Sequence, residues 1–347
     1  MRALLIKSVG RAAPHVVGDI GEVMERMGHE VGYVDAIDIS KEDPEELEEK
    51  RNLWCMELTT EAMDYDVVIG YGLNNFQIYQ EGDIIKDAVI DAGCKSVSIL
   101  YDSPLTPGMY TMMQNFSHRD THGYFVWDRH WAKRMEVCMI PNVYWMPIGV
   151  NTERFKKVEL TDEQEKKYGC DMSFVGSWSE EREAFLSAVA QNFKGKFRIY
   201  GHDWGERKNH FIDSKLRGEA NNSEELNIVY NASRINLNFT VNQGIESVNM
   251  RILEAASAES LVLTDWKQDL MKMGINEKIA VYSDFKDAVS KAMHYKDSEL
   301  NNVRQQAAER IRQLHKYEFR IAMIEKFVNS SSEVAMHWMD FVDGGRS

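Results

Sequence analysis

The sequence lacks the features that would place a protein in a membrane. Its 347 residues contain no run of about 18 apolar residues, so no membrane-spanning helix is predicted. The apolar stretch at the beginning, residues 2–6, is too short for a secretion signal and predicts a first β-strand instead. We therefore expect a cytoplasmic protein without a membrane span.

Cysteine is scarce, and so are metal-binding motifs. The four cysteines are scattered, without a C-x-x-C pair, at Cys55, Cys94, Cys138 and Cys170. This spacing predicts neither a zinc site nor a disulfide framework, in keeping with a reducing compartment. The chain contains no H-E-x-x-H motif and no D-x-D pair at a predicted strand end. We expect no metal site.

Positive charge is also in short supply. The chain has 41 Lys and Arg against 55 Asp and Glu, a formal net charge of −14. An acidic chain of this kind is a poor default binder of a phosphate backbone, which argues against nucleic acid as a partner. A single modified base as a small acceptor stays open.

What the sequence does contain is a regular alternation of strands and helices, which predicts an α/β fold with doubly wound parallel sheets. Two series of predicted strands stand on either side of a Pro- and Gly-containing stretch, residues 147–155. We expect one domain over residues 1–155 and a second over 156–317. Two terminal helices are predicted, over residues 317–329 and 333–341.

The most informative stretch is residues 242–265. Glu246 and Glu254 stand eight positions apart, and we expect a helix from about Ser247 that carries both carboxylates on roughly one side. Small residues and a buried strand at 261–263 follow. A loop that opens a helix and leads into a parallel strand is how open α/β sheets build ligand crevices. Taken alone, the spacing would equally fit two solvated carboxylates on a helix.

This stretch resembles the Glu-x7-Glu signature of retaining GT-B glycosyltransferases, such as those of glycosyltransferase family 4. The segment P-I-G-V-N-T-E-R-F at 147–155 is similar to the P-x-G-V-D-x-x-x-F interdomain junction of that family, with Asn151 in place of the usual Asp. The resemblance implies a GT-B fold. In this fold two Rossmann-like domains face each other across a cleft, and C-terminal helices cross back to the first domain. The resemblance therefore implies that helices in residues 318–347 return to the first domain.

Three further motifs resemble the CgeB-like glycosyltransferases. They are F-V-G-S followed by Arg182 and then I-Y-G, the N-x-R-x-x-E run of Asn249, Arg251 and Glu254, and the Y-D-S-P segment at 101–104. Together the motifs span nearly the whole chain. Each is weak alone, and the order in which they occur carries the resemblance.

The resemblance implies roles for individual residues of the second domain. Glu254 would accept hydrogen bonds from the ribose hydroxyls of a nucleotide, and Glu246 would lie at the donor sugar. Arg182 and Arg251 would neutralise the diphosphate. Related enzymes place a Lys four or five residues after the first Arg, where this chain has Leu186 and Ser187, so we expect Arg251 to supply the missing charge. The remaining donor-site candidates are Gly176, Ser177, Gly244 and Asn249.

In the first domain, Asp102 and His118 are candidate catalytic residues. Asp102 follows a predicted strand at its carboxyl end, where a carboxylate could orient an acceptor hydroxyl. A lone histidine in a polar loop, such as His118, is more often structural. Trp178, Tyr200 and Trp204 could stack on a nucleobase, although packing in the core would explain each of them equally well.

The resulting hypothesis is a metal-independent, retaining glycosyltransferase without a cofactor. It would move a hexosyl or pentosyl group from a nucleotide diphosphate donor, by default a UDP-sugar, to a hydroxyl-bearing acceptor. Two alternatives stay open: a GT-B nucleotide-sugar epimerase, and a non-catalytic two-lobed protein that binds a sugar or nucleotide.

Overall fold

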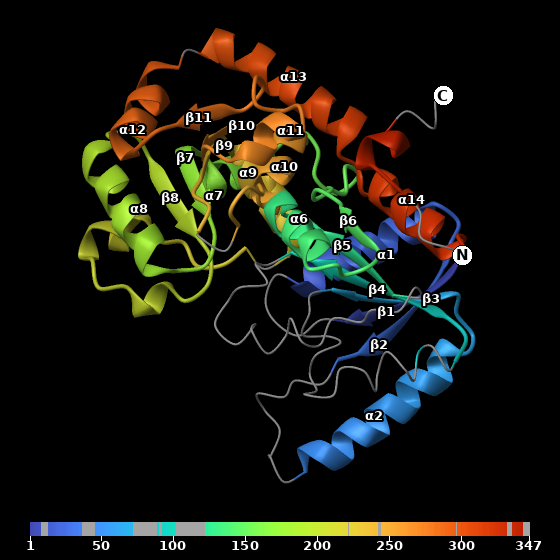
Figure 1. Cartoon of the computed structure of the whole chain (residues 1–347). Helices are drawn as coiled ribbons and strands as arrows, with labels where there is room; N and C mark the ends of the chain where they lie inside the picture. Colours follow the sequence, from blue (N-terminus) through green and yellow to red (C-terminus); the bar gives the residue numbers. More distant parts are fainter. Residues whose placement is uncertain are drawn as a thin grey trace. The chain divides into compact units, whose positions relative to one another are not determined.

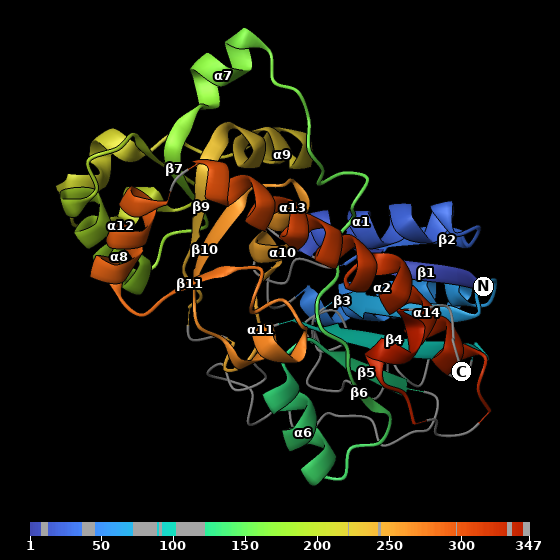
Figure 2. The same ribbon diagram turned by 90° about the horizontal axis from the view of Figure 1, so that it is seen from above.

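The computed structural model divides the chain into two compact units, each built on its own parallel β-sheet (Figures 1 and 2). Unit 1 comprises Met1–Ile148 and Tyr317–Ser347, and unit 2 comprises Gly149–Lys316. The structure describes residues 1–7, 13–36, 46–71, 89, 92–101, 122–220, 222–241, 244–295, 297–331 and 335–342.

The described part of unit 1 contains a six-stranded sheet in which neighbouring strands run parallel. The strand order changes direction between β1 and β3, which is the topological switch point of the sheet. In sheet order the strands are β2 (Glu30–Asp35), β1 (Arg2–Lys7), β3 (Val67–Tyr71), β4 (Lys95–Leu100), β5 (His122–Val126) and β6 (Val143–Trp145).

Apolar residues cover both faces of this sheet because its strands are buried between helices. Leu4 and Ile6 of β1 pack with Trp54 and Leu58 in one core cluster. Strand β5 packs against Trp131 in a second core cluster. Trp54 and Leu58 belong to α2 (Leu47–Ala62), and Trp131 belongs to α6 (Arg129–Val137). Helix α1 (Ala13–Arg26) packs against β1 and β2. Gly28, at φ 85°, follows α1 as glycine commonly does at a helix C-terminus.

The terminal helix α14 (Tyr317–Val328) belongs to unit 1. Arg320 fixes it there. The Arg320 Nε donates to the carbonyl oxygen of Pro147 at 2.6 Å, and the guanidinium lies 4.9 Å from the ring centre of Trp338. Burial lowers the pKa of Arg320 to about 9. The Nζ of Lys95 also donates to the carbonyl oxygen of Phe327, at 2.7 Å.

The prediction of a second terminal helix over residues 333–341 is wrong for the residues that the structure describes there. Only a short 3-10 helix, η3 (Trp338–Phe341), forms. His337 caps it, and the side chain of Asp340 bonds back to the His337 amide at 3.0 Å. Trp338 is fully buried, so this segment is anchored by one side chain and not by a helical face.

Unit 2 contains a five-stranded parallel sheet whose order changes direction between β7 and β9. In sheet order its strands are β11 (Ala280–Tyr282), β10 (Leu261–Asp265), β9 (Ser233–Asn238), β7 (Cys170–Val175) and β8 (Phe197–Tyr200). Its helices are α7 (Asp162–Tyr168), α8 (Glu180–Asn192), α9 (Ser223–Ala232), α10 (Met250–Ser257), α11 (Gln268–Lys272), α12 (Phe285–His294) and α13 (Asp297–Leu314), with the 3-10 helices η1 (Trp204–Glu206) and η2 (His210–Lys215).

The two faces of the unit 2 sheet differ in polarity. The face toward α8 and α12 is apolar, with Phe174, Leu237 and Leu263 in one core cluster. On the face toward α9 and α10, polar side chains alternate with these residues and are buried: Ser173, Asn236, Asn238 and Thr264. Buried polar groups are costly unless they form hydrogen bonds, so these side chains require partners within the unit.

The fold confirms the predicted α/β class with two Rossmann-like sheets. In the described part of the chain, no helix combines the length and the apolar character needed to cross a bilayer.

Candidate functional site

The candidate site lies at the carboxyl edge of the unit 2 sheet, where β7 and β9 are neighbours at the switch point. After Val175 the chain turns through Gly176 and Ser177 and enters α8. Ser179 caps this helix by accepting a hydrogen bond from the Arg182 amide at 3.2 Å. The Arg182 side chain folds back, and its Nη1 donates to the Ser177 carbonyl oxygen at 2.8 Å. The cap and the turn therefore fix a cation at the ligand-binding edge of the sheet.

A close backbone contact holds the Gly176 turn in place. The Gly176 amide donates to the Tyr200 carbonyl oxygen at 2.9 Å, and the Trp204 indole donates to the Gly176 carbonyl oxygen at 3.0 Å. Gly201 has φ 142°, and a Cβ placed there would lie 2.1 Å from the Gly176 carbonyl oxygen. Only glycine fits at residue 201, because both its conformation and the space demand it.

Glu183 ties α8 to two other segments. Its Oε2 accepts from the indole of Trp178 at 2.7 Å, and its Oε1 accepts from the amides of Lys208 and Asn209 at 2.8 and 2.5 Å. Burial raises the pKa of this carboxyl group, but the hydrogen bonds outweigh burial and the pKa falls below its usual value. Glu183 thus fixes the first turn of α8, which carries Arg182.

The glutamate pair is arranged differently from the sequence prediction. Helix α10 begins at Met250, with Asn249 as its extended N-cap residue (φ −92°, ψ 164°), and not near Ser247. Glu246 therefore lies in the preceding loop, and the two carboxylates do not share a helix face. The Asp269 amide donates to the Glu246 carbonyl oxygen at 3.0 Å, and Lys267 Nζ donates to the Gly244 carbonyl oxygen at 2.9 Å. These bonds from the α11 region hold the loop out of the helix.

Asn238, the last residue of β9, is the centre of a hydrogen-bond network. Its Oδ1 accepts from Asn249 Nδ2 at 2.9 Å and from Arg251 Nε at 3.4 Å, and its Nδ2 donates to Thr264 Oγ1 at 2.9 Å. The Asn249 side chain is thereby directed at β9 and does not cap α10. Asp265 extends the network by accepting from the Thr240 amide at 2.9 Å.

The electrostatics of this edge are dominated by two guanidinium groups. Burial, and then the charge of Arg251, lowers the pKa of Arg182 to about 9. Desolvation likewise lowers the pKa of Arg251, against the opposing effects of Tyr230, Glu254 and Asp265. Arginine remains charged at neutral pH, so two cations are held in a partly desolvated place where an anionic group would be stabilised.

Glu254 lies three residues after Arg251 on α10, so the two side chains are neighbours along the helix. It is buried, and its Oε2 accepts a hydrogen bond from the Tyr230 hydroxyl at 2.8 Å. Burial and the Glu254 charge raise the pKa of Tyr230 well above its usual value, so Tyr230 is a hydrogen-bond donor at neutral pH. The site thus combines two cations with an acceptor-only carboxylate.

The structure places the other sequence candidates as follows. Tyr200 and Trp204 are buried, and Trp204 packs against Phe174 in the core; Trp178 is half-buried. Asp102 and His118 lie outside the described residues. Among the described residues, no three His, Cys, Asp or Glu side chains lie together in a way that could hold a metal ion.

Sequence reasoning missed Asn238, Asp265, Tyr230, Gly201 and Glu183. One of them, Asn238, left a signal: the strand S-R-I-N-L-N carries asparagines at alternate positions, on one face of a strand that is otherwise buried. Polar residues at alternate positions of a buried strand indicate a built hydrogen-bond network.

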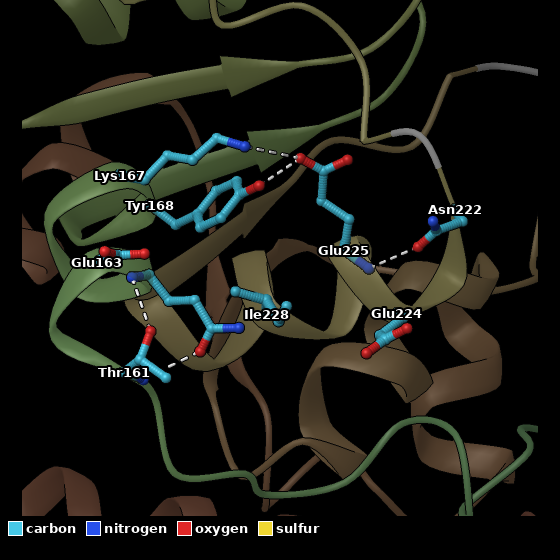
Figure 3. Close-up of a pocket in the computed structure, with 9 residues that line it drawn as sticks. Thr161, Glu163, Lys167, Tyr168, Asn222, Glu224, Glu225 and Ile228 are labelled. Atoms are coloured by element: carbon cyan, nitrogen blue, oxygen red, sulfur yellow. Dashed lines mark hydrogen bonds and ion pairs between the residues drawn. The ribbon is translucent and has the colours of Figure 1, made fainter.

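A separate open groove lies between α7 and the first part of α9 (Figure 3). There the Tyr168 hydroxyl donates to Glu225, whose Oε1 also lies 3.6 Å from Lys167 Nζ. The residues that line this groove include none of the predicted site residues.

No curated protein sequence matches the chain. Residues 181–326 match the family model described as glycosyl transferase-like, and this range contains Arg182, Glu246, Arg251 and Glu254.

Solved structures resemble the chain over nearly its whole length. A glycosyltransferase from Rickettsia africae matches with a TM-score of 0.67, 12% identity, and coverage of 95% of this chain and 99% of that one. The fold is that of the GT-B glycosyltransferases. Sucrose-phosphate synthase from Thermosynechococcus elongatus gives a TM-score of 0.66 at 11% identity, covering 94% of this chain and 98% of that one. Anabaena HepE in complex with UDP and glucose gives 0.66 at 12% identity, covering 94% and 99%.

At 11–12% identity these likenesses describe the GT-B fold and not a shared reaction. Any evidence for the reaction must therefore come from the side chains at the carboxyl edge of the unit 2 sheet.

Proposed function

We propose that this chain is a glycosyltransferase whose unit 2 binds a nucleotide diphosphate sugar, with a UDP-sugar as donor. The observation that carries the proposal is the pair of guanidinium groups, Arg182 and Arg251, at the switch point between β7 and β9. Burial, and then the charge of Arg251, lowers the pKa of Arg182, and an anion bound between the two guanidinium groups would relieve their mutual repulsion. The family match of residues 181–326 and the UDP bound to Anabaena HepE support the same reading.

The proposed mechanism follows from charge. As the bond to the sugar breaks, negative charge grows on the leaving diphosphate, and Arg182 and Arg251 would stabilise it because they are already fixed there. The amides around Gly176 and Ser177 would approach the phosphates, and Glu254 would accept hydrogen bonds from the ribose hydroxyls. Glu246, in the loop before α10, would lie at the donor sugar.

Three finer points belong to the proposal. Two guanidinium groups can do the work of a divalent ion, which supports catalysis without metal. The Glu-x7-Glu resemblance supports retention of the anomeric configuration and kinship with the CgeB-like group. Asp102 and His118 stay predictions for the acceptor side, where a hydroxyl would attack the transferred hexose or pentose.

The test is incubation of the purified protein with UDP-glucose and other UDP-sugars, with and without a panel of hydroxyl-bearing acceptors. Released UDP and the sugar products are measured by mass spectrometry, and the product anomer by NMR. Chelator should leave the rate unchanged. Conversion of the UDP-sugar to an epimer without transfer would favour an epimerase, and tight UDP binding without any turnover would favour a binding protein.

A further inference from the structure

Tyr230 makes one contact that the proposed reaction does not use. It lies on the last turn of α9, and its hydroxyl donates to Glu254 Oε2 at 2.8 Å. The residue is 1% exposed, and its ring centre lies 6.1 Å from that of Phe155. Its carbonyl oxygen accepts from Asn236 Nδ2 at 3.2 Å and from the Ser260 hydroxyl. The backbone of Tyr230 is therefore held by hydrogen bonds, and its ring is held by packing against Phe155.

A glutamate side chain on a helix has several rotamers, and fixing one of them costs conformational entropy. In Glu254 this cost is met before any ligand arrives, since a buried hydrogen bond from a rigid tyrosine sets the direction of the carboxylate. A carboxylate has about four lone-pair sites on its two oxygens and can accept from several donors at once, so a bond from Tyr230 is compatible with bonds from ribose hydroxyl groups.

We propose that Tyr230 is the positioning residue of the ribose subsite: it holds Glu254 in the orientation that accepts the 2′ and 3′ hydroxyls of the nucleotide. This inference rests on the proposed function. It predicts that Tyr230, which is too buried to serve as the ligand's own contact, controls discrimination between ribose and a sugar that lacks these hydroxyls.

The test compares the binding of UDP and 2′,3′-dideoxy-UDP by calorimetry. Wild type should prefer UDP. Tyr230→Phe, which keeps the ring, should weaken UDP binding about fivefold or more while changing dideoxy-UDP binding less than about twofold. A purely structural role would weaken both nucleotides equally, and an unchanged preference would mean that Glu254 needs no help; either result overturns the proposal.

Tyr168→Phe is the matched control. It removes a tyrosine-to-glutamate hydrogen bond of the same kind, to Glu225 in the groove of Figure 3, and should alter neither affinity. If Tyr230→Phe does not fold, Tyr230→Met fills much of the same space and takes its place. In the Glu254→Gln background, adding Tyr230→Phe should cause no further loss of UDP preference; a further loss would show that Tyr230 acts elsewhere.

The measurements on wild type also distinguish failure of the proposed donor site from failure of the positioning role of Tyr230. If wild type binds no UDP, the donor site itself is wrong and the Tyr230 assignment falls with it. If wild type prefers UDP over the dideoxy nucleotide and Tyr230→Phe retains that preference, the donor site stands and only the positioning role is lost.

Discussion

The pKa of Arg182 on α8 is lowered to about 9 by burial and then by the charge of Arg251 on α10, although the two residues are far apart in the sequence. The strand order of unit 2 explains how they meet. Helix α8 follows β7 and helix α10 follows β9, and these two strands are neighbours in the sheet. Each helix therefore begins at the same edge, and each brings a cation to it.

Replacing Arg251 by Ala should weaken the binding of UDP far more than that of uridine, because the guanidinium would act on phosphate and not on the nucleoside. Charge-assisted hydrogen bonds contribute roughly 1.5–3 kcal/mol, about a ten- to hundredfold loss in UDP affinity. Calorimetric titrations with UDP and with uridine measure the loss of affinity for each ligand. Arg312→Ala is the control, since Arg312 forms a part-exposed ion pair with Glu259 at 2.8 Å. Equal losses for UDP and uridine would place Arg251 away from the diphosphate.

Substitution of Glu254 should affect UDP binding, whereas substitution of Glu246 should affect turnover. Glu254→Gln replaces one acceptor oxygen by a donor group, which would face either the Tyr230 hydroxyl or a ribose hydroxyl. We expect UDP binding to weaken by about 1–3 kcal/mol. Glu246→Gln should instead slow turnover and leave UDP affinity nearly unchanged. Calorimetry and initial rates on both variants, with circular dichroism to confirm folding, decide this. The opposite pattern would mean that the two assigned roles are exchanged.

The α/β class was predictable from the sequence because short apolar runs record burial directly. Residues 2–6 and 261–263 are such runs, and both form buried strands. The start of α10 was not predictable in the same way. Ser247 and Asn249 are both residue types favoured at a helix N-cap, so the local sequence does not decide where α10 begins. The loop before the helix is held by Asp269 and Lys267, which come from beyond the next strand.

The same distinction applies to the candidate site. Arg251 and Glu254 stand in a local motif and could be named from it. Asn238, Asp265 and Tyr230 could not, because their roles depend on which strands and helices become neighbours. Asn238, for example, bonds to Thr264 only because β9 and β10 pair in that register. Side-chain partners of this kind follow from topology, which short-range patterns do not encode.

Gly201→Ala should both destabilise the protein and weaken UDP binding. The new Cβ would lie 2.1 Å from the Gly176 carbonyl oxygen and 3.2 Å from the Ser177 amide nitrogen, at φ 142°. A strained backbone conformation of this kind costs on the order of 1–3 kcal/mol, and its relief would displace the Gly176 turn beside Arg182. Gly205→Ala, four residues on, is the control, because its added Cβ would meet nothing within 4 Å. Thermal unfolding and UDP titration of both variants should differ sharply; similar behaviour would contradict the close contact.

Glu183 should stabilise unit 2 through its charge. Glu183→Gln keeps the shape but turns one acceptor into a donor group that must face either the Trp178 indole or the amides of Lys208 and Asn209. Leaving such groups unsatisfied costs about 1–3 kcal/mol. Glu180→Gln, in the same turn, removes an exposed ion pair with Lys208 and should leave the stability nearly unchanged, because solvent screens exposed ion pairs.

The pH dependence of the melting temperature shows whether Glu183 stabilises the protein through its charge or through its packing. The pKa of Glu183 is lower in the folded protein than its ordinary value of 4.5. The folded carboxyl group therefore holds its proton less tightly than the unfolded one, and its stabilising contribution is complete above pH 4.5. As the pH falls through the folded pKa, the wild-type carboxylate becomes protonated and this contribution is lost. The difference in melting temperature between wild type and Glu183→Gln should thus be constant from pH 7 to about 5 and narrow below 4.5. A difference that stays the same at every pH would assign the effect of Glu183 to packing and not to its charge.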